Sequence, residues 1–150
     1  MDLQYRGTLI SFLSFFIASI GVSASLNFFS ESLYYTLGLL MYLPIFLIPS
    51  LLYERRRDAR ILYIMIALLW ITSFIFTAAY LSIQGLGGTA SGAPGEDLQL
   101  SISSGARGFI MVSFPYLAYT STFLAVYSKW RELAVELGGY TLIFLFFSLI

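Results

Sequence analysis

Few side chains of this sequence could do chemistry, and the strongest candidate is a carboxylate. Glu136 lies in the otherwise apolar segment Leu133–Ile150. A carboxylate within a membrane is costly, and it commonly marks a site for a proton, an ion or a substrate. Glu136 lies only about a turn inside the segment, so the alternative is pairing with Arg131, Arg60 or Lys129 near the surface. The shallow position favours this pairing.

Three prolines interrupt apolar segments and could free backbone carbonyl groups. Pro44, Pro49 and Pro115 have no N–H, so the carbonyl four residues earlier loses its usual donor. Freed carbonyls at membrane depth can line an ion or substrate path. The affected carbonyls are those of Leu40, Ile45 and Met111. The alternative, which we favour, is that each proline bends its helix and shapes packing only.

Two tyrosines, Tyr42 and Tyr119, fall near the middle of apolar segments, where a hydroxyl needs a hydrogen-bond partner. A quinone carbonyl is one such partner. A neighbouring serine or backbone carbonyl is the partner we expect, so no cofactor is assigned.

Small residues recur at heptad spacing in two segments and predict close helix packing. Such stripes let helix backbones approach one another, which drives association in lipid. They face either other helices of this chain or a partner subunit, and the sequence leaves both open. The residues are Ser11, Ser14, Ala18, Gly21 and Ser25 in the first stripe, and Ala118, Ser121, Ala125 and Ser128 in the second.

These residues must be positioned by membrane-spanning helices. Of all residues, 59% are hydrophobic and only 11% are charged, far from the composition of soluble domains. The sequence predicts a single all-α domain over residues 1–150, a bundle of five transmembrane helices. The expected spans are 9–29, 33–53, 61–83, 108–128 and, with less support, 133–150.

The short segment Glu54–Arg60, with sequence ERRRDAR, sets the orientation. Arginine-rich loops between spans stay in the cytoplasm. The N-terminus is then cytoplasmic, the loop 84–107 is external, and the C-terminus is external. The basic residues that fix this topology and meet anionic lipid are Arg55, Arg56, Arg57, Arg60, Lys129 and Arg131.

Two segments allow a second interpretation. Leu9–Ile20 behind Arg6, followed by Val22-Ser23-Ala24, also fits a secretory signal peptide, although we take it as a span. At the other end, residues 129–137 could form a helix in the interface, with Gly138 and Gly139 as a hinge.

The loop 84–107 contains the stretch GLGGTASGAPGED, which has permissive backbone and little to bury. Residues 98–103 then alternate apolar and polar side chains, as a short strand does. A strand with no sheet of its own predicts pairing with the edge of another protein.

Composition excludes several classes of function. The net charge is zero, so nucleic acid is not an expected partner. The sequence has no cysteine and no histidine, the usual ligands and general bases of redox and metal sites. We therefore expect no catalytic residues, no metal, no cofactor and no intrinsic enzyme activity.

The pattern is typical of a cofactor-free accessory subunit of a larger membrane complex, in a multi-pass protein of the cell membrane. A respiratory or other energy-converting complex is the expected host, by analogy with such assemblies. Its partners would be other integral membrane subunits and lipids, with quinone as a remote possibility. The alternative is a small homo-oligomeric channel, transporter or lipid-handling protein.

Overall fold

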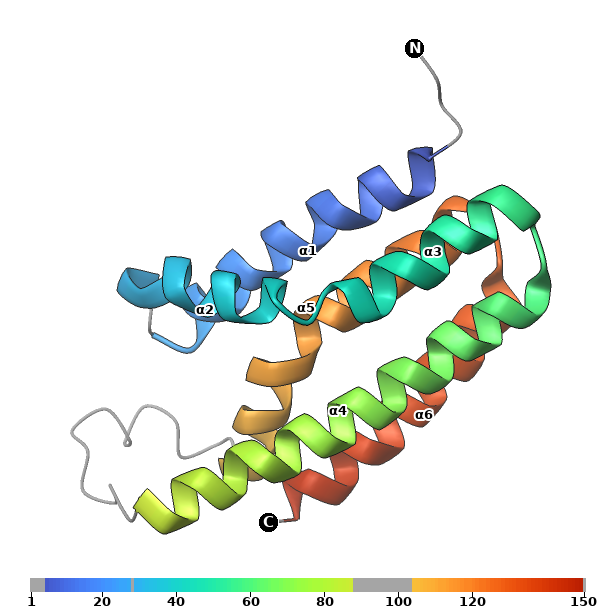
Figure 1. The fold of residues 1–150 in the computed structure, drawn as a ribbon. Coiled ribbons are helices and arrows are strands. Elements are labelled where there is room, and N and C mark those ends of the chain that lie inside the picture. The colour runs from blue at the N-terminus through green and yellow to red at the C-terminus, as the bar shows by residue number, and fades with distance from the viewer. Residues whose placement is uncertain (1–4, 28, 88–103, 150) are drawn as a thin grey trace.

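The described chain is all-helical (Figure 1). The structure is a computed structural model and describes residues 5–27, 29–87 and 104–149. Six α-helices and one 3-10 turn follow one another along the sequence. They are α1 (Arg6–Ser25), η1 (Phe29–Glu31), α2 (Ser32–Leu40), α3 (Pro44–Arg56), α4 (Ala59–Gly87), α5 (Ser104–Val126) and α6 (Trp130–Ser148).

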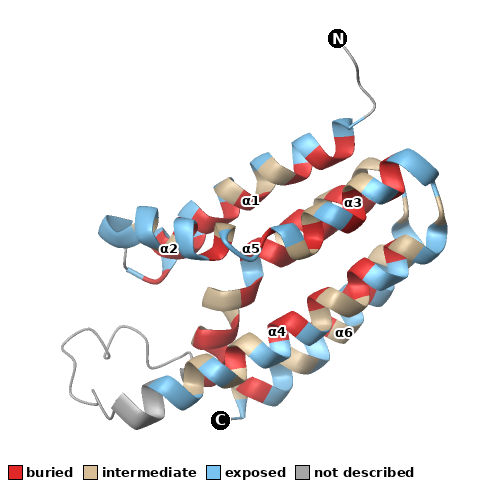
Figure 2. Cartoon of the chain, in the orientation of Figure 1, coloured by how far each residue is buried: buried red, intermediate tan, exposed pale blue. Residues whose placement is uncertain are grey.

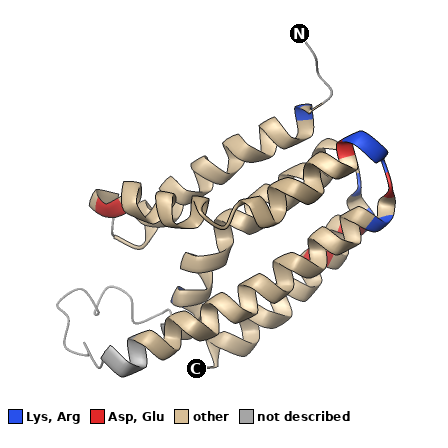
Figure 3. Ribbon diagram, in the orientation of Figure 1, with Lys and Arg blue, Asp and Glu red and all other residues tan. Residues whose placement is uncertain are grey.

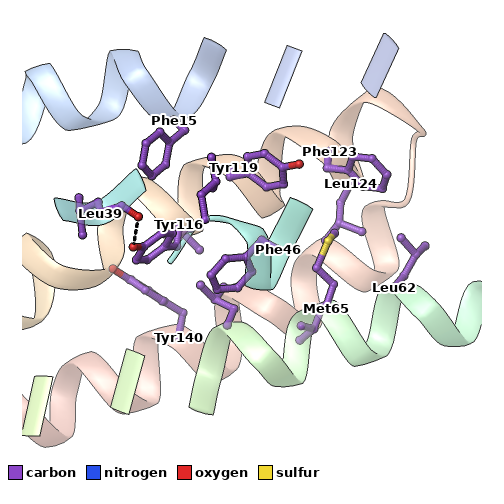
Figure 4. Packing of buried hydrophobic residues seen from close by; sticks show 14 of the residues in the cluster. Phe15, Leu39, Phe46, Leu62, Met65, Tyr116, Tyr119, Phe123, Leu124 and Tyr140 are labelled. Atoms are coloured by element: carbon purple, nitrogen blue, oxygen red, sulfur yellow. Dashed lines mark hydrogen bonds between the residues drawn. The ribbon is translucent and has the colours of Figure 1, made fainter. Parts of the chain in front are cut away.

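Helix α5 is the centre of the bundle, because it contacts α1, α3, α4 and α6. Buried residues gather along it and on the helix faces turned toward it (Figure 2). Its aromatic side chains form much of the core (Figure 4): Tyr116, Tyr119 and Phe123 have no exposed surface, and the Tyr116 ring stacks on Phe46 at 5.1 Å. Close aromatic contacts of this kind replace burial from water as the source of packing energy in lipid.

Three helices, α1, α4 and α5, are long and apolar enough to cross a membrane. The pair formed by η1–α2 and α3 meets the same test together, which makes up to four spans. In length and composition these helices are compatible with a multi-pass membrane protein. Helix α6 carries Arg131, Glu132 and Glu136 and is outside this set. The fifth span therefore stays a prediction.

The predicted span 33–53 consists of two helices that meet at Pro44, as the bend expected from its prolines predicts. The two parts meet at a bend of 58°. Pro44 begins α3 and has no N–H, so the ladder stops and Leu43 N–H reaches only the carbonyl of Leu40. Pro49 lies inside α3 without breaking it. The Tyr116 hydroxyl donates to the carbonyl of Leu39 at 2.5 Å, just before the break (Figure 4).

Helix α6 is continuous through Gly138 and Gly139, so the described chain has no hinge there. It runs beside α4 (Figure 1) and contacts it. A Cβ on Gly139 would lie 2.2 Å from Cε2 of Trp70, whereas a Cβ on Gly138 would meet nothing within 4 Å. Gly139 therefore admits the Trp70 ring, and packing explains this half of the glycine pair.

The basic residues of the predicted cytoplasmic side lie at one end of the bundle, which we call the basic end (Figure 3). It collects the start of α1, the α3–α4 connection and the α5–α6 connection. The α3–α4 connection is shorter than the predicted loop 54–60, because α3 continues to Arg56 and α4 starts at Ala59. At the opposite end, helix also replaces parts of the predicted loop 84–107: α4 extends to Gly87 and α5 begins at Ser104. The predicted strand 98–103 lies outside the described residues.

Candidate functional site

The main polar site at the basic end is built around Glu54, whose side chain is 3% exposed. Its Oε1 accepts the backbone N–H of Thr8 at 2.6 Å and the Thr8 hydroxyl at 3.1 Å. Thr8 lies in the first turn of α1, where N–H groups have no partner within the helix, and Tyr5 provides no side-chain cap. A carboxylate from the end of α3 thus caps α1 and complements the positive end of its dipole.

Gly7 makes this approach possible. A Cβ at this position would lie 2.8 Å from Glu54 Oε1 and 2.5 Å from Cε2 of Tyr127. The Arg57 guanidinium lies 4.5 Å from the centre of the Tyr127 ring, a cation–π distance. Arg57 ends α3 in the left-handed conformation, at φ 57°, which turns the chain toward α4.

A line of hydroxyl groups continues from the cap into the bundle. Thr8 Oγ1 lies 3.3 Å from Ser50 Oγ, and Ser50 Oγ is hydrogen-bonded to the Tyr119 hydroxyl at 2.7 Å. All three side chains are buried. The expected serine partner for Tyr119 is therefore present, on α3. Tyr42 differs, because its ring packs edge-on against Phe76 and is 48% exposed.

A second buried carboxylate, Glu136 on α6, lies on another side of α5. Ser121 Oγ donates to its Oε1 at 2.5 Å, and the Trp70 indole N–H donates to the Glu136 backbone carbonyl at 3.1 Å. Glu136 has no exposed surface. This corrects the expectation that Glu136 pairs with Arg131, Arg60 or Lys129: the side chain is buried, and its partner is the Ser121 hydroxyl on α5.

The two carboxylates are linked to neighbouring positions of α5, since Tyr119 belongs to the Glu54 cluster and Ser121 holds Glu136. In each carboxylate Oε1 is bonded, whereas Oε2 has no partner among the described residues. The described chain contains no group of three histidine, cysteine or acidic residues that could hold a metal ion. The hydrogen bonds join separate helices, so their first effect is to fix α1, α3 and α6 around α5.

The carbonyl freed by Pro115 is satisfied inside the chain. The Tyr35 hydroxyl on α2 donates to the carbonyl of Met111 at 2.5 Å. Met111 is four residues before Pro115, where the proline removes the helical donor. At this proline the Tyr35 hydroxyl replaces the missing N–H as the donor to the carbonyl. A carbonyl bonded in this way favours a packing role for Pro115 over a role in a transport path.

The first small-residue stripe is divided between two environments. Ser11 has no exposed surface and Ala18 is 8% exposed, and Ser14 Oγ donates to the carbonyl of Ala118 at 3.4 Å. Gly21 and Ser25 are exposed, and a Cβ on Gly21 would meet nothing within 4 Å.

The second stripe also meets residues of this chain. Thr122, beside Ala118, donates to Ser14 at 2.8 Å, while Ser121 holds Glu136. Ala125 is half-buried and Ser128 is exposed at the end of α5, with φ 56°. The stripe therefore lies between α1 and α6 rather than on one open face.

Helix α5 bends near its middle. Figure 1 shows α5 changing direction along its course, and Pro115 lies at the middle of Ser104–Val126. The half before Pro115 turns to α4, where a Cβ on Gly108 would lie 2.9 Å from Tyr80. Both halves contact α1: Arg107, before the proline, donates to the carbonyl of Leu26 at 3.4 Å, and Ala118 and Thr122, after it, are hydrogen-bonded to Ser14.

The basic residues are arranged around the basic end and are mostly exposed. The one ion pair among the described residues joins Arg60 to Asp58 at 3.1 Å. Hydrogen bonds from Arg60 hold the pKa of Asp58 below its usual value. The other exposed cations of this end are Arg6, Arg55, Arg56, Arg57 and Arg131, with Lys129 half-buried.

Sequence reasoning missed the cap, because Glu54 was assigned to the cytoplasmic loop with the arginines. Its partner Thr8 is 46 residues away, and no local pattern joins them. One signal was available: Thr8, Ser11 and Ser50 are hydroxyl residues in otherwise apolar segments, and they predict polar contacts between helices.

Comparison of the sequence and the structure with known protein families, curated proteins and solved structures found no match.

Proposed function

We propose that the chain is a cofactor-free packing subunit of a larger membrane complex. The observation that carries the proposal is the open face at Gly21. The same stripe is buried against α5 at Ser11 and Ala18, but a side chain at Gly21 would meet nothing of this chain.

Glycine within a helix costs about 0.5–1 kcal/mol relative to alanine, so its presence asks for a reason. Gly7, Gly108 and Gly139 have one, since a Cβ there would lie 2.5, 2.9 and 2.2 Å from a neighbouring side chain. Gly21 has no such neighbour within the described chain; Gly38 and Gly138 are equally open, but of the three only Gly21 continues a stripe of small residues. A second helix that approaches the backbone of α1 would supply it, as at small-residue contacts in membranes.

The host that we propose is a respiratory or other energy-converting complex of the cell membrane. Assemblies of this kind hold small helical subunits beside their cofactor-bearing chains, which is an argument by analogy. The polar groups inside this chain support a structural role, because Glu54, Ser121 and Tyr35 each join two helices.

The orientation is part of the proposal. We place the basic end in the cytoplasm, the C-terminus outside, and α6 across the membrane as a fifth span beside α4. The collection of basic residues at one end of the bundle supports this assignment (Figure 3).

The sequence contains no cysteine, so single cysteines report the orientation directly. Asp58→Cys should react with a membrane-impermeant maleimide only after the cytoplasmic side is opened. Ser30→Cys, in η1 at the opposite end of the bundle, should react from outside in intact cells. The reverse pattern would refute the orientation.

The packing role is tested by Gly21→Leu. We expect this variant to insert and fold normally. The amount of membrane chains that co-purify with it should fall about tenfold or more, since a bulky side chain prevents close helix contact. Gly138→Leu is the matched control, because Gly138 is equally open but belongs to neither small-residue stripe. Full retention of partners by Gly21→Leu, or equal loss in both variants, would contradict the proposal.

A second candidate is a small homo-oligomeric channel, transporter or lipid-handling protein. The same open face at Gly21 favours it, because two copies could meet there around a two-fold axis. In that case Gly21→Leu would dissociate a homo-oligomer rather than release other chains.

A further inference from the structure

An open groove lies on the surface of the bundle, between the start of α1 and one face of α3. Its volume is about 450 Å³, and it is lined by Tyr5, Ile48, Leu51, Leu52 and Arg55. Leu51 and Leu52 each lie three or four positions from both Ile48 and Arg55, so the four residues form one continuous helix face. Over the seven steps from Ile48 to Arg55 this face rises roughly 10 Å.

The lining changes in character along its length. Ile48, Leu51 and Leu52 give an apolar floor, and Ile48 is 58% exposed. Arg55, in the last turn of α3, and Tyr5, the residue before α1, line the groove at the basic end. The groove thus has an apolar floor and, at the basic end, a cation and a hydroxyl group. This arrangement complements a phospholipid, whose acyl chain lies inward and whose phosphate lies at the interface.

The charge at the mouth of the groove is not neutralised by the described chain. The adjacent carboxylate, Glu54, turns inward to cap α1, and the one described ion pair is that of Asp58 with Arg60. Arg6 and Arg56, next to Tyr5 and Arg55 in sequence, are also exposed. The last turn of α3 therefore holds its carboxylate inside the bundle and presents its arginines outside.

The geometry points to a specific site for one anionic phospholipid of the surrounding leaflet, with its acyl chain on Ile48 and Leu52 and its headgroup at Arg55 and Tyr5. This site is independent of the proposed packing role, because it belongs to the isolated chain. Its shape also depends on the Glu54–Thr8 contact, which holds the start of α1 against α3.

The test is native mass spectrometry of the purified chain titrated with phosphatidylglycerol, or with phosphatidylcholine of the same acyl chains. We expect one molecule of phosphatidylglycerol to bind, with an affinity about fivefold or more above that of phosphatidylcholine. Arg55→Gln should remove most of that preference. Arg131→Gln, which removes the same charge from α6 at the same end, should keep it. Equal binding of both lipids, or equal loss in both variants, would overturn the site.

A second measurement identifies the occupant in membranes. A photoreactive amino acid in place of Ile48 should cross-link to phospholipid, and Leu52→Trp, which fills the groove without a change of charge, should reduce that product. Cross-linking to a polypeptide instead would show that a partner helix occupies the groove, and would overturn the lipid assignment.

Discussion

Glu54 at the end of α3 caps the first turn of α1 by accepting both the N–H and the hydroxyl of Thr8, at 2.6 and 3.1 Å. The contact joins residues 46 positions apart. Glu54 directly precedes three arginines in the sequence, yet its side chain points into the bundle. It ties the N-terminus of one apolar helix to the C-terminus of another. The carboxylate of Glu54 therefore helps to hold the start of α1 against α3.

Replacement of this cap should loosen the basic end. Glu54→Ala removes two hydrogen bonds and the negative charge at the start of α1, and we expect it to lower the free energy of unfolding by about 1–2 kcal/mol. Thermal unfolding in detergent measures the loss. Glu132→Ala is the control, because Glu132 makes only an exposed 3.3 Å contact with the Tyr63 hydroxyl. An equal effect of both substitutions would show that Glu54 is not a cap.

Two glycines of α1 should respond to alanine in opposite ways. Gly7→Ala places a Cβ 2.5 Å from Tyr127 and 2.8 Å from Glu54, and should destabilise the protein by about 1–3 kcal/mol. Gly21→Ala meets open space and should be neutral or stabilise α1 by up to about 1 kcal/mol. Both are measured on the isolated chain in detergent. Similar unfolding temperatures for the two variants would contradict the packing of α1.

How far the sequence predicted these contacts depended on whether their cause was local. The break at Pro44 and the free carbonyl of Met111 follow from the missing N–H of proline, and sequence reasoning located both. The donor to Met111 was not predicted, because Tyr35 lies 76 residues away on another helix. For Glu54, local composition was misleading: three arginines follow it, yet a buried N–H on α1 is a better partner for its carboxylate than water.

The phenol that replaces the missing donor of Pro115 gives a coupled prediction. Tyr35→Phe leaves the Met111 carbonyl without this partner and should cost about 1–2 kcal/mol. In a Pro115→Ala background the helix regains its own N–H, so the same substitution should cost less than half as much. Unfolding of the wild type, both single variants and the double variant measures this coupling. Strict additivity would mean that the two residues do not share the carbonyl.

Adjacent glycines in α6 test its packing against α4. Gly139→Ala places a Cβ 2.2 Å from the Trp70 ring and should destabilise the protein by about 1–3 kcal/mol. Gly138→Ala meets nothing within 4 Å and should be tolerated or slightly stabilising. Trp70 fluorescence should shift in the first variant only, because its indole also donates to the Glu136 carbonyl. Equal behaviour of the two variants would favour a hinge at this glycine pair instead.

Native mass spectrometry shows whether the chain works as a packing subunit of a larger membrane complex. The protein is solubilised gently from its own membranes, without overexpression. We predict that it migrates with larger, cofactor-bearing chains at a fixed stoichiometry, and that Gly21→Leu releases it. A homo-oligomer, or a lone chain that carries only lipid, would contradict the claim.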